Sequence, residues 1–139
     1  MEYPIANIIL SQTAKEQLTK IKRITKIENW NILCRWAFCV SLAEPSMPSP
    51  APIPADSNVS MTWKVFGGEI SDILLLALKQ RCANDKLTLD KETLAQQFRL
   101  HLHRGIGYIA GNTKIKNIED LINLAQKNYV SNSVINHHR

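Results

Sequence analysis

The chain has 139 residues, 45% of them hydrophobic, and its 17 Lys and Arg outnumber 12 Asp and Glu to give a formal net charge of +5. This length and apolar content suit one compact domain with its own core. No run of 18 or more apolar residues occurs, and the N-terminus lacks the features of a signal peptide, so we expect neither a membrane protein nor a secreted one. The basic excess suits a polyanionic partner, although many proteins without one carry a similar charge.

The N-terminal segment predicts a short strand followed by a helix. Residues 6–10 are mostly apolar and end at Ser11, a residue type that often caps a helix. In the helix that follows, Ala14, Leu18 and Ile21 recur at helical spacing and make one apolar stripe. One face of this helix should therefore pack against the core while the rest is solvated.

A second helix is predicted from the N-cap Asn29 to the first proline of the next segment, Pro45. Apolar side chains cover every side of it, and Arg35 and Ser41 are the main polar interruptions. Such a helix must be buried all round, which a chain of this size rarely achieves alone. We therefore expect part of its surface to contact another subunit of a homo-oligomer.

The middle of the chain predicts a loop and then a strand. Residues 45–54 hold five of the six prolines, which favours an extended, stiff spacer. The alternative, a ligand for an SH3-type domain, lacks a basic residue beside its PxxP spacing. Residues 62–66 predict a short strand that stops at two glycines and could pair with the N-terminal strand.

The C-terminal half is predicted to be helical. Residues 70–83 form one buried helix, and Asp90 caps a longer one that Gly105 and Gly107 interrupt and Gly111 ends. Its inward-facing residues are expected to be Leu94, Phe98, Leu102 and Ile109. Asn117 and Asp120 resemble a capping box for a last helix over residues 118–126. The fold class is thus mainly α with a short β element near the N-terminus, in a single compact domain over residues 1–127 followed by a flexible tail over residues 128–139.

Positive charge gathers in and just after the first helix. The candidate DNA-binding residues are Lys15, Lys20, Lys22, Arg23 and Lys26, opposed only by Glu16 and Glu28. At 100° per residue, Lys15, Lys22 and Lys26 fall within about 40° of one another, beside the apolar stripe. Such a row can follow a phosphate backbone by replacing counterions, without reading bases. The alternative is an ordinary solvated helix face.

A second basic area would combine Lys114 and Lys116 with Arg99 and Arg104 of the long helix. Ordinary surface charge is the simpler interpretation of these four residues. Gly67 and Gly68 lack the spacing and the Lys-Ser/Thr pair of a nucleotide-binding loop, so no such site is expected.

The residue types that carry catalysis or metal binding are not clustered. Carboxylates are scattered around helix ends, where capping explains most of them. His101 and His103 point about 200° apart on a helix, and Cys34 and Cys39 about 140° apart, so neither pair suits one metal ion. The two thiols are expected to be small core residues. We predict no catalytic residue, no metal and no cofactor, and the odd number of cysteines favours a reducing cytoplasm.

The stretch IILSQTAKEQLTKIKRITKIENWNILCRWAFCVSL resembles the N-terminal signature of the DndE family of DNA sulfur modification proteins. NILCRWAFCVSL carries the resemblance most specifically, because Asn31, Cys34 and Arg35 keep their places among apolar residues. The proline-rich connection, FGGE, DILLLALKQR and FRLHLHRGIGYIAG extend it over residues 5–126. The tail departs from the family pattern.

The resemblance implies a mostly α-helical protein with a ribbon-helix-helix-like N-terminal part. It also implies a homotetramer that binds double-stranded DNA, preferably nicked, through surface lysines, alongside other DNA phosphorothioation proteins. Two alternatives stay open: a scaffold that binds these proteins through the apolar second helix, and an enzyme that nicks DNA.

Overall fold

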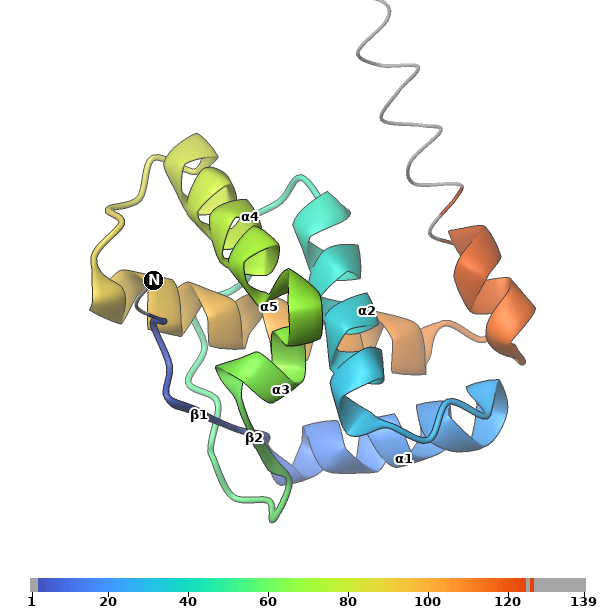
Figure 1. Ribbon diagram of the computed structural model, residues 1–139. Coiled ribbons are helices and arrows are strands. Elements are labelled where there is room, and N and C mark those ends of the chain that lie inside the picture. Colours follow the sequence, from blue (N-terminus) through green and yellow to red (C-terminus); the bar gives the residue numbers. More distant parts are fainter. Residues whose placement is uncertain (1–2, 125, 127–139) are drawn as a thin grey trace, which may run out of the picture.

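The computed structural model describes residues 3–124 and 126, and in that part of the chain a two-stranded sheet lies beside a group of packed helices (Figure 1). The strands β1 (Asn7–Ile9) and β2 (Ser60–Thr62) are antiparallel, with Ile8 opposite Met61. The helices are α1 (Gln12–Thr25), α2 (Trp30–Ala43), α3 (Trp63–Gly67), the short 3-10 helix η1 (Gly68–Ile70), α4 (Ser71–Asn84) and α5 (Lys91–Gly111). Residues 118–124 are also helical. The mainly α fold with a short β element is confirmed; the predicted tail lies outside the described residues.

The first helix forms as its sequence predicts. The Ser11 hydroxyl accepts a hydrogen bond from the Ala14 amide at 3.0 Å, which caps α1. Ala14, Leu18 and Ile21 are buried, so the predicted stripe is the packed face. The helix ends at Thr25, and Lys26 follows in the left-handed conformation with φ 64°. A strand followed by two helices agrees with the ribbon-helix-helix-like order, but β1 pairs with β2 of the same chain.

The helices α2 and α5 form the centre of the molecule and cross at a glycine. A Cβ on Gly105 would lie 1.7 Å from the carbonyl oxygen of Ala37, so only glycine allows the backbones to approach this closely. The predicted interruption at Gly105 and Gly107 is therefore wrong: α5 runs unbroken to Gly111. The aromatic rings of Phe38, Trp63, Phe66 and Phe98 pack together beside this crossing, with centroids 4.7 to 5.8 Å apart.

The predicted strand over residues 62–66 is also wrong, because the strand stops where the prediction begins it. The Thr62 hydroxyl accepts a hydrogen bond from the Val65 amide and starts α3. Helical geometry places Trp63 and Phe66 in the core, and the Trp63 ring nitrogen donates to the Ser71 carbonyl at 3.1 Å. Pairing with the N-terminal strand is correct, through Ser60–Thr62.

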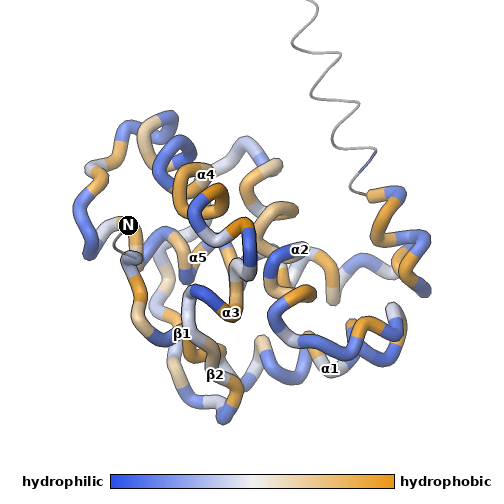
Figure 2. Tube along the Cα trace, in the orientation of Figure 1, coloured by the Kyte–Doolittle hydropathy of each residue, from blue (hydrophilic) through white to orange (hydrophobic). Residues whose placement is uncertain are grey.

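Only one side of α2 is fully buried within the single chain, in line with the expectation that a chain of this size cannot cover the helix alone; burial of the rest by another subunit stays a prediction. The buried residues of α2 are Leu33, Cys34, Ala37, Phe38 and Ser41. Ile32, Trp36 and Val40 are half-buried and Cys39 is exposed, which corrects the prediction that Cys39 is a core residue. Asn29 precedes the helix but makes no capping bond through its side chain. Figure 2 shows mainly apolar colours along α2 and alternating colours along α1.

None of the helices among the described residues is long and apolar enough to cross a membrane.

Candidate nucleic-acid interface

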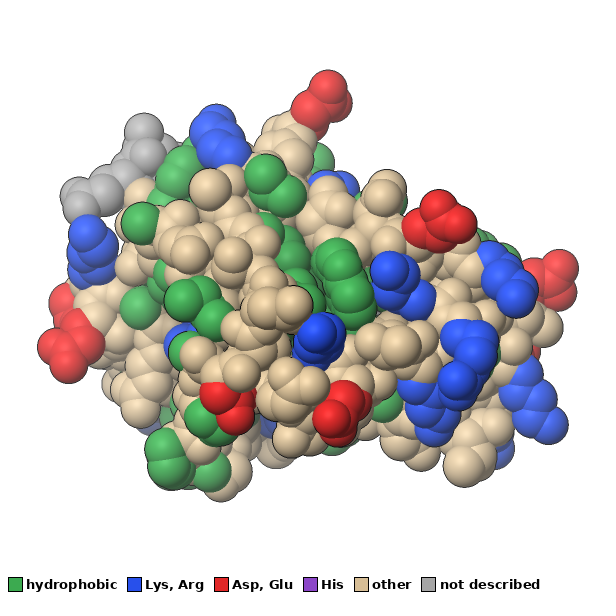
Figure 3. Space-filling model, turned by 90° about the horizontal axis from the view of Figure 1, so that it is seen from below, with side chains coloured by type: hydrophobic (Ala, Val, Ile, Leu, Met, Phe, Trp, Pro, Cys, Tyr) green, Lys and Arg blue, Asp and Glu red, His purple; other side chains and the backbone are tan. Residues whose placement is uncertain are grey.

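The five candidate cations all lie on α1 or at its C-terminal end, and we call them the α1 cations: Lys15, Lys20, Lys22, Arg23 and Lys26. Seen from the side of α1, the Lys and Arg side chains gather at one end of the molecule's face (Figure 3). From residue 17 to residue 27 the chain contains no Asp or Glu. Within this stretch the cations therefore have no acidic residue next to them in sequence, and Glu16 and Glu28 flank it.

Three of the α1 cations are partly engaged with the protein. The Lys15 ammonium donates to the Asn58 side-chain oxygen at 2.6 Å, and the Lys20 ammonium donates to the Ala110 carbonyl at 2.9 Å. The Lys22 nitrogen lies 4.2 Å from the centroid of the Trp30 ring, a cation–π contact. These contacts fix the three ammonium groups in place at the surface and leave each of them with further donors.

Arg23 and Lys26 are exposed, and within the described residues their side chains make no hydrogen bond or ion pair. Lys26 lies just after the helix and has a positive φ. Its side chain therefore does not point in the direction that helical spacing predicts for a single stripe. The structure thus replaces the single stripe with a cluster: Lys22, Arg23 and Lys26 share the C-terminal end of α1, Lys15 lies at the other end, and Lys20 turns towards α5.

The two arginines of the possible second basic area bind backbone carbonyls, so they contribute neither to such an area nor to ordinary solvated surface charge. Arg99 donates to the carbonyls of Ile9 and Ile53, at 2.6 and 3.1 Å. Arg104 donates to the carbonyls of Ser41 and Ser46, at 2.8 and 2.7 Å. A guanidinium fork that is used in this way is not available to a phosphate.

Arg81 of α4 continues the same pattern on the proline-rich segment. Its two terminal nitrogens donate to four carbonyls, those of Leu42, Glu44, Pro45 and Ser46, at 2.7 to 3.1 Å. Its Nε donates to Asp85 at 2.9 Å. Arg35 donates to the Phe66 carbonyl. We call Arg35, Arg81, Arg99 and Arg104 the carbonyl-binding arginines, and they hold the segments around the core in place.

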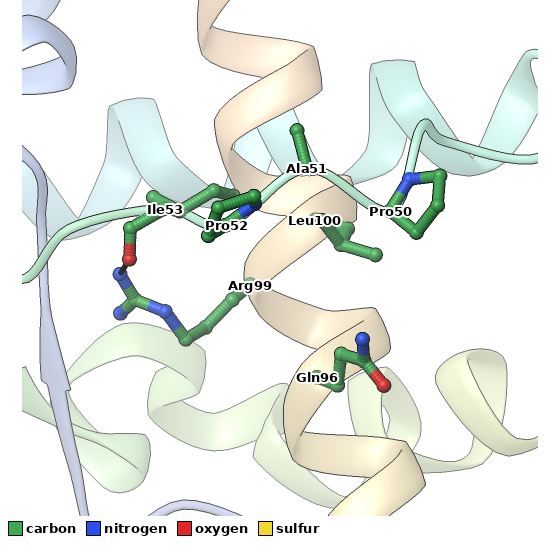
Figure 4. Close-up of a pocket in the computed structure, with 7 residues that line it drawn as sticks. All are labelled: Pro50, Ala51, Pro52, Ile53, Gln96, Arg99 and Leu100. Atoms are coloured by element: carbon green, nitrogen blue, oxygen red, sulfur yellow. Dashed lines mark hydrogen bonds between the residues drawn. The ribbon is translucent and has the colours of Figure 1, made fainter.

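A shallow pocket of about 220 Å³ lies between the proline-rich segment and α5 (Figure 4). Its walls are Pro50, Ala51, Pro52, Ile53, Gln96, Arg99 and Leu100. The Arg99 guanidinium points to the Ile53 carbonyl rather than into open space, as the dashed line in Figure 4 marks. The pocket therefore offers a ligand mainly apolar contacts and one side-chain amide.

The two histidines of α5 serve different contacts, as their predicted divergence requires. His101 is buried, and its Nδ1 lies 2.8 Å from the Ser41 hydroxyl. Burial, with Arg81 and Arg104 nearby, lowers the His101 pKa to about 4. His103 accepts from the Ser11 amide at 3.2 Å through Nε2, and its Nδ1 lies 2.8 Å from the Arg99 carbonyl. Burial lowers the His103 pKa as well.

Among residues 3–124 and 126, no three His, Cys, Asp or Glu side chains come together in a way that could hold a metal ion. Of the thiols, Cys34 is fully buried, and that burial raises its pKa to about 12. A thiol with this pKa stays protonated at neutral pH.

Comparison with known proteins places the chain in a family. The family model described as "DNA sulphur modification protein DndE" matches residues 7–117. The chain belongs to the DndE family. Its fold is also that of two DndE crystal structures. DndE from Escherichia coli B7A, described as involved in DNA phosphorothioation modification, has a TM-score of 0.64 and 24% identity, over 78% of this chain and 98% of that one.

The second structure, a DndE mutant involved in DNA phosphorothioation, has a TM-score of 0.61 and 23% identity, over 78% of this chain and 99% of that one. A comparison with curated protein sequences finds no match. The predicted family is confirmed. The α1 cations and the arginines above all lie within the matched residues.

Proposed function

We propose that this DndE-family protein is a non-catalytic DNA-binding component of the phosphorothioation system. It binds double-stranded DNA, preferably nicked, through the α1 cations while other proteins of the system handle the sulfur. The observation that carries the proposal is the exposed end of α1, where Arg23 and Lys26 lie beside Lys22 in a stretch without acidic residues. The preference for nicked duplex rests on the family resemblance.

The expected binding mode is contact with phosphates. Lysine ammonium groups act as point charges, which neutralise phosphates and release counterions but carry no information on base sequence. From Lys15 to Lys26 the helix rise amounts to roughly 16 Å, the axial length of about five phosphates on one strand. The α1 cations therefore extend over an axial length comparable with that of a short duplex segment.

A scaffold is the alternative that has an observation in its favour. Ile73 and Leu76 of α4 are 63% and 55% exposed, and Trp36 and Val40 of α2 are only half-buried. Apolar side chains at the surface suit contact with other proteins. A DNA-nicking enzyme would be accepted only if metal-dependent cleavage persisted on purification and a single carboxylate substitution abolished it.

We also propose that the protein acts in the cytoplasm as a homotetramer. The incompletely covered side of α2 supports self-association, since an apolar helix gains from burial by a second copy. Assembly would repeat the α1 cations several times on one particle and raise its avidity for DNA.

The test is binding to nicked and intact duplexes of one sequence over a salt series, with the molar mass in solution measured in parallel. The variant is Lys15→Gln/Lys22→Gln/Lys26→Gln. Its control is Lys64→Gln/Lys79→Gln/Lys86→Gln, which removes the same charge from α3, α4 and the turn after α4. We expect the wild type and the control to bind alike, with tighter binding to nicked duplex.

In the α1 variant, the slope of log affinity against log salt should fall by about 0.9 for each phosphate that the variant no longer neutralises. Equal binding by the wild type and the α1 variant would contradict the proposal and favour the scaffold. A molar mass of one chain would contradict the tetramer.

A further inference from the structure

The helices α1 and α5 lie side by side and run in the same direction (Figure 1). Two hydrogen bonds fix their register: the Ser11 amide donates to His103, and the Lys20 ammonium donates to the Ala110 carbonyl. The two hydrogen-bonded pairs are 92 and 90 residues apart in sequence, so the offset hardly changes along the pair. The last turn of α1, which comes after Lys20, is therefore level with the residues that come after Ala110.

Those residues form a turn, residues 112–117, that is held in place by its own contacts. The Ile115 amide donates to the Asn112 carbonyl at 3.1 Å, and the Lys114 amide donates to the Asn112 side chain at 3.0 Å. Ile115 is buried in the core. The Lys116 amide donates to the Asp120 carboxylate at 2.8 Å. The turn thus has a defined position, and its backbone and buried side chain determine that position.

The side chains of Lys114 and Lys116 are exposed on this turn. From residue 112 to residue 118 the chain contains no Asp or Glu, as is also true of residues 17–27. The carboxylate of Asp120, which follows the turn, accepts the hydrogen bond of the Lys116 amide. The register of α1 with α5 therefore joins two acid-free basic segments that are about 90 residues apart in sequence.

We propose that Lys114 and Lys116 form one continuous phosphate-binding surface with Lys22, Arg23 and Lys26 at the end of α1. This deepens the proposed function and rests on it, since the ligand is the same duplex DNA. The three cations at the end of α1 contact one stretch of phosphate backbone. The turn adds a second group of cations beside them, so that the surface contacts more phosphates than α1 alone.

The test uses the full chain with Lys114→Gln/Lys116→Gln and measures the salt dependence of binding to nicked duplex. The backbone bonds of the turn do not involve either ammonium, so we expect the variant to fold, as circular dichroism and the thermal midpoint will check. The salt slope should fall by about 1.8, which is 0.9 for each of two phosphates. Lys114→Arg/Lys116→Arg should keep the wild-type slope. Lys79→Gln/Lys86→Gln, with the same charge loss on the far side of the molecule, should also keep it.

The outcomes separate this inference from the proposed function. If the α1 variant binds weakly while Lys114→Gln/Lys116→Gln binds like the wild type, the turn is an ordinary solvated surface and the inference is wrong, but the α1 proposal stands. If the wild type does not bind DNA with a measurable salt slope, the proposed function itself fails. If the Lys79→Gln/Lys86→Gln control loses as much affinity as the turn variant, only total charge matters and the inference is overturned.

Discussion

The arginines around α5 and the lysines of α1 have the same formal charge but opposite roles in the molecule. Arg81, Arg99 and Arg104 direct their guanidinium groups to backbone carbonyls beneath the surface. Lys22 and Lys26 keep their ammonium groups at the surface. A guanidinium has five donors in a rigid fork that can reach several carbonyls, whereas an ammonium is a compact, strongly hydrated charge. The net charge of +5 therefore does not indicate how much positive charge is accessible to a ligand at the surface.

The proline-rich segment explains why three arginines bind backbone carbonyls. Proline has no N–H, and an extended chain makes no hydrogen bonds with itself, so the carbonyls of such a segment need donors from elsewhere. Arg81, Arg99 and Arg104 supply them at Pro45, Ser46 and Ile53. The arginines thus stabilise the fold while the α1 lysines remain available, and substitutions in the two sets should have separable effects.

The largest effect is expected for Arg81→Met. The substitution removes the donors of four buried or partly buried carbonyls and leaves Asp85 without its partner, which should lower the free energy of unfolding by about 4 kcal/mol. Urea unfolding measures the loss. Arg81→Lys keeps the charge but not the fork and should recover only a small part of it. Full recovery by lysine would show that charge alone matters at this position.

A smaller effect is expected from acid. The unfolded chain protonates His101 near its ordinary pKa of about 6.5, whereas the folded chain resists protonation down to about 4 because of burial and of Arg81 and Arg104. Stability should be complete above pH 6.5 and fall as the pH drops towards 4, by roughly 1.4 kcal/mol for each unit of pKa shift. His103 should add to the slope in the same direction.

The variant that tests this is His101→Asn, whose amide can replace the contact of Nδ1 with Ser41. It will be less stable at neutral pH because it leaves a small cavity, but the dependence of unfolding free energy on pH between 6.5 and 4 should be flatter than in the wild type. An unchanged slope would show that other groups cause the acid sensitivity.

The sequence predicts the local features of the fold well. The Ser11 cap, the stripe of α1 and the start of α5 at Asp90 depend on residues within a few positions of one another. The Asp120 amide also donates to the Asn117 side chain, which is one of the two bonds of the predicted capping box; the Asp120 carboxylate accepts from the Lys116 amide instead of the Asn117 amide. Features that depend on distant partners were predicted less well, although the pairing of the two strands was correct. Thr62–Phe66 has strand-forming residues, but burial of Trp63 and Phe66 against α5 overrides that preference.

The same distinction applies to the candidate site. The α1 cations could be found because they lie in one short segment, and Figure 3 shows Lys and Arg gathered on that side of the molecule. The involvement of Arg99 and Arg104 in the fold could not be found, because it depends on where the proline-rich segment passes. Lys114 and Lys116 stand out in the sequence as basic residues, but their place beside α1 could not be predicted, since it follows from the register of two helices that are distant in sequence.

The smallest effect is expected at the two lysines with positive φ, Lys26 at 64° and Lys86 at 62°. These two residues give the sharpest test of whether a lysine binds DNA because of its place on α1. A non-glycine residue in the left-handed region costs roughly 1 kcal/mol, so Lys26→Gly and Lys86→Gly should each leave stability equal to the wild type or raise it by up to about that amount. Lys26 lies among the α1 cations and Lys86 follows α4 on the other side of the molecule. Lys26→Gly should therefore weaken DNA binding and lower the salt slope by about 0.9, while Lys86→Gly leaves both unchanged. Thermal unfolding and the salt series measure the two effects on the same samples. Equal DNA binding by the two variants would show that the Lys26 ammonium does not contact a phosphate.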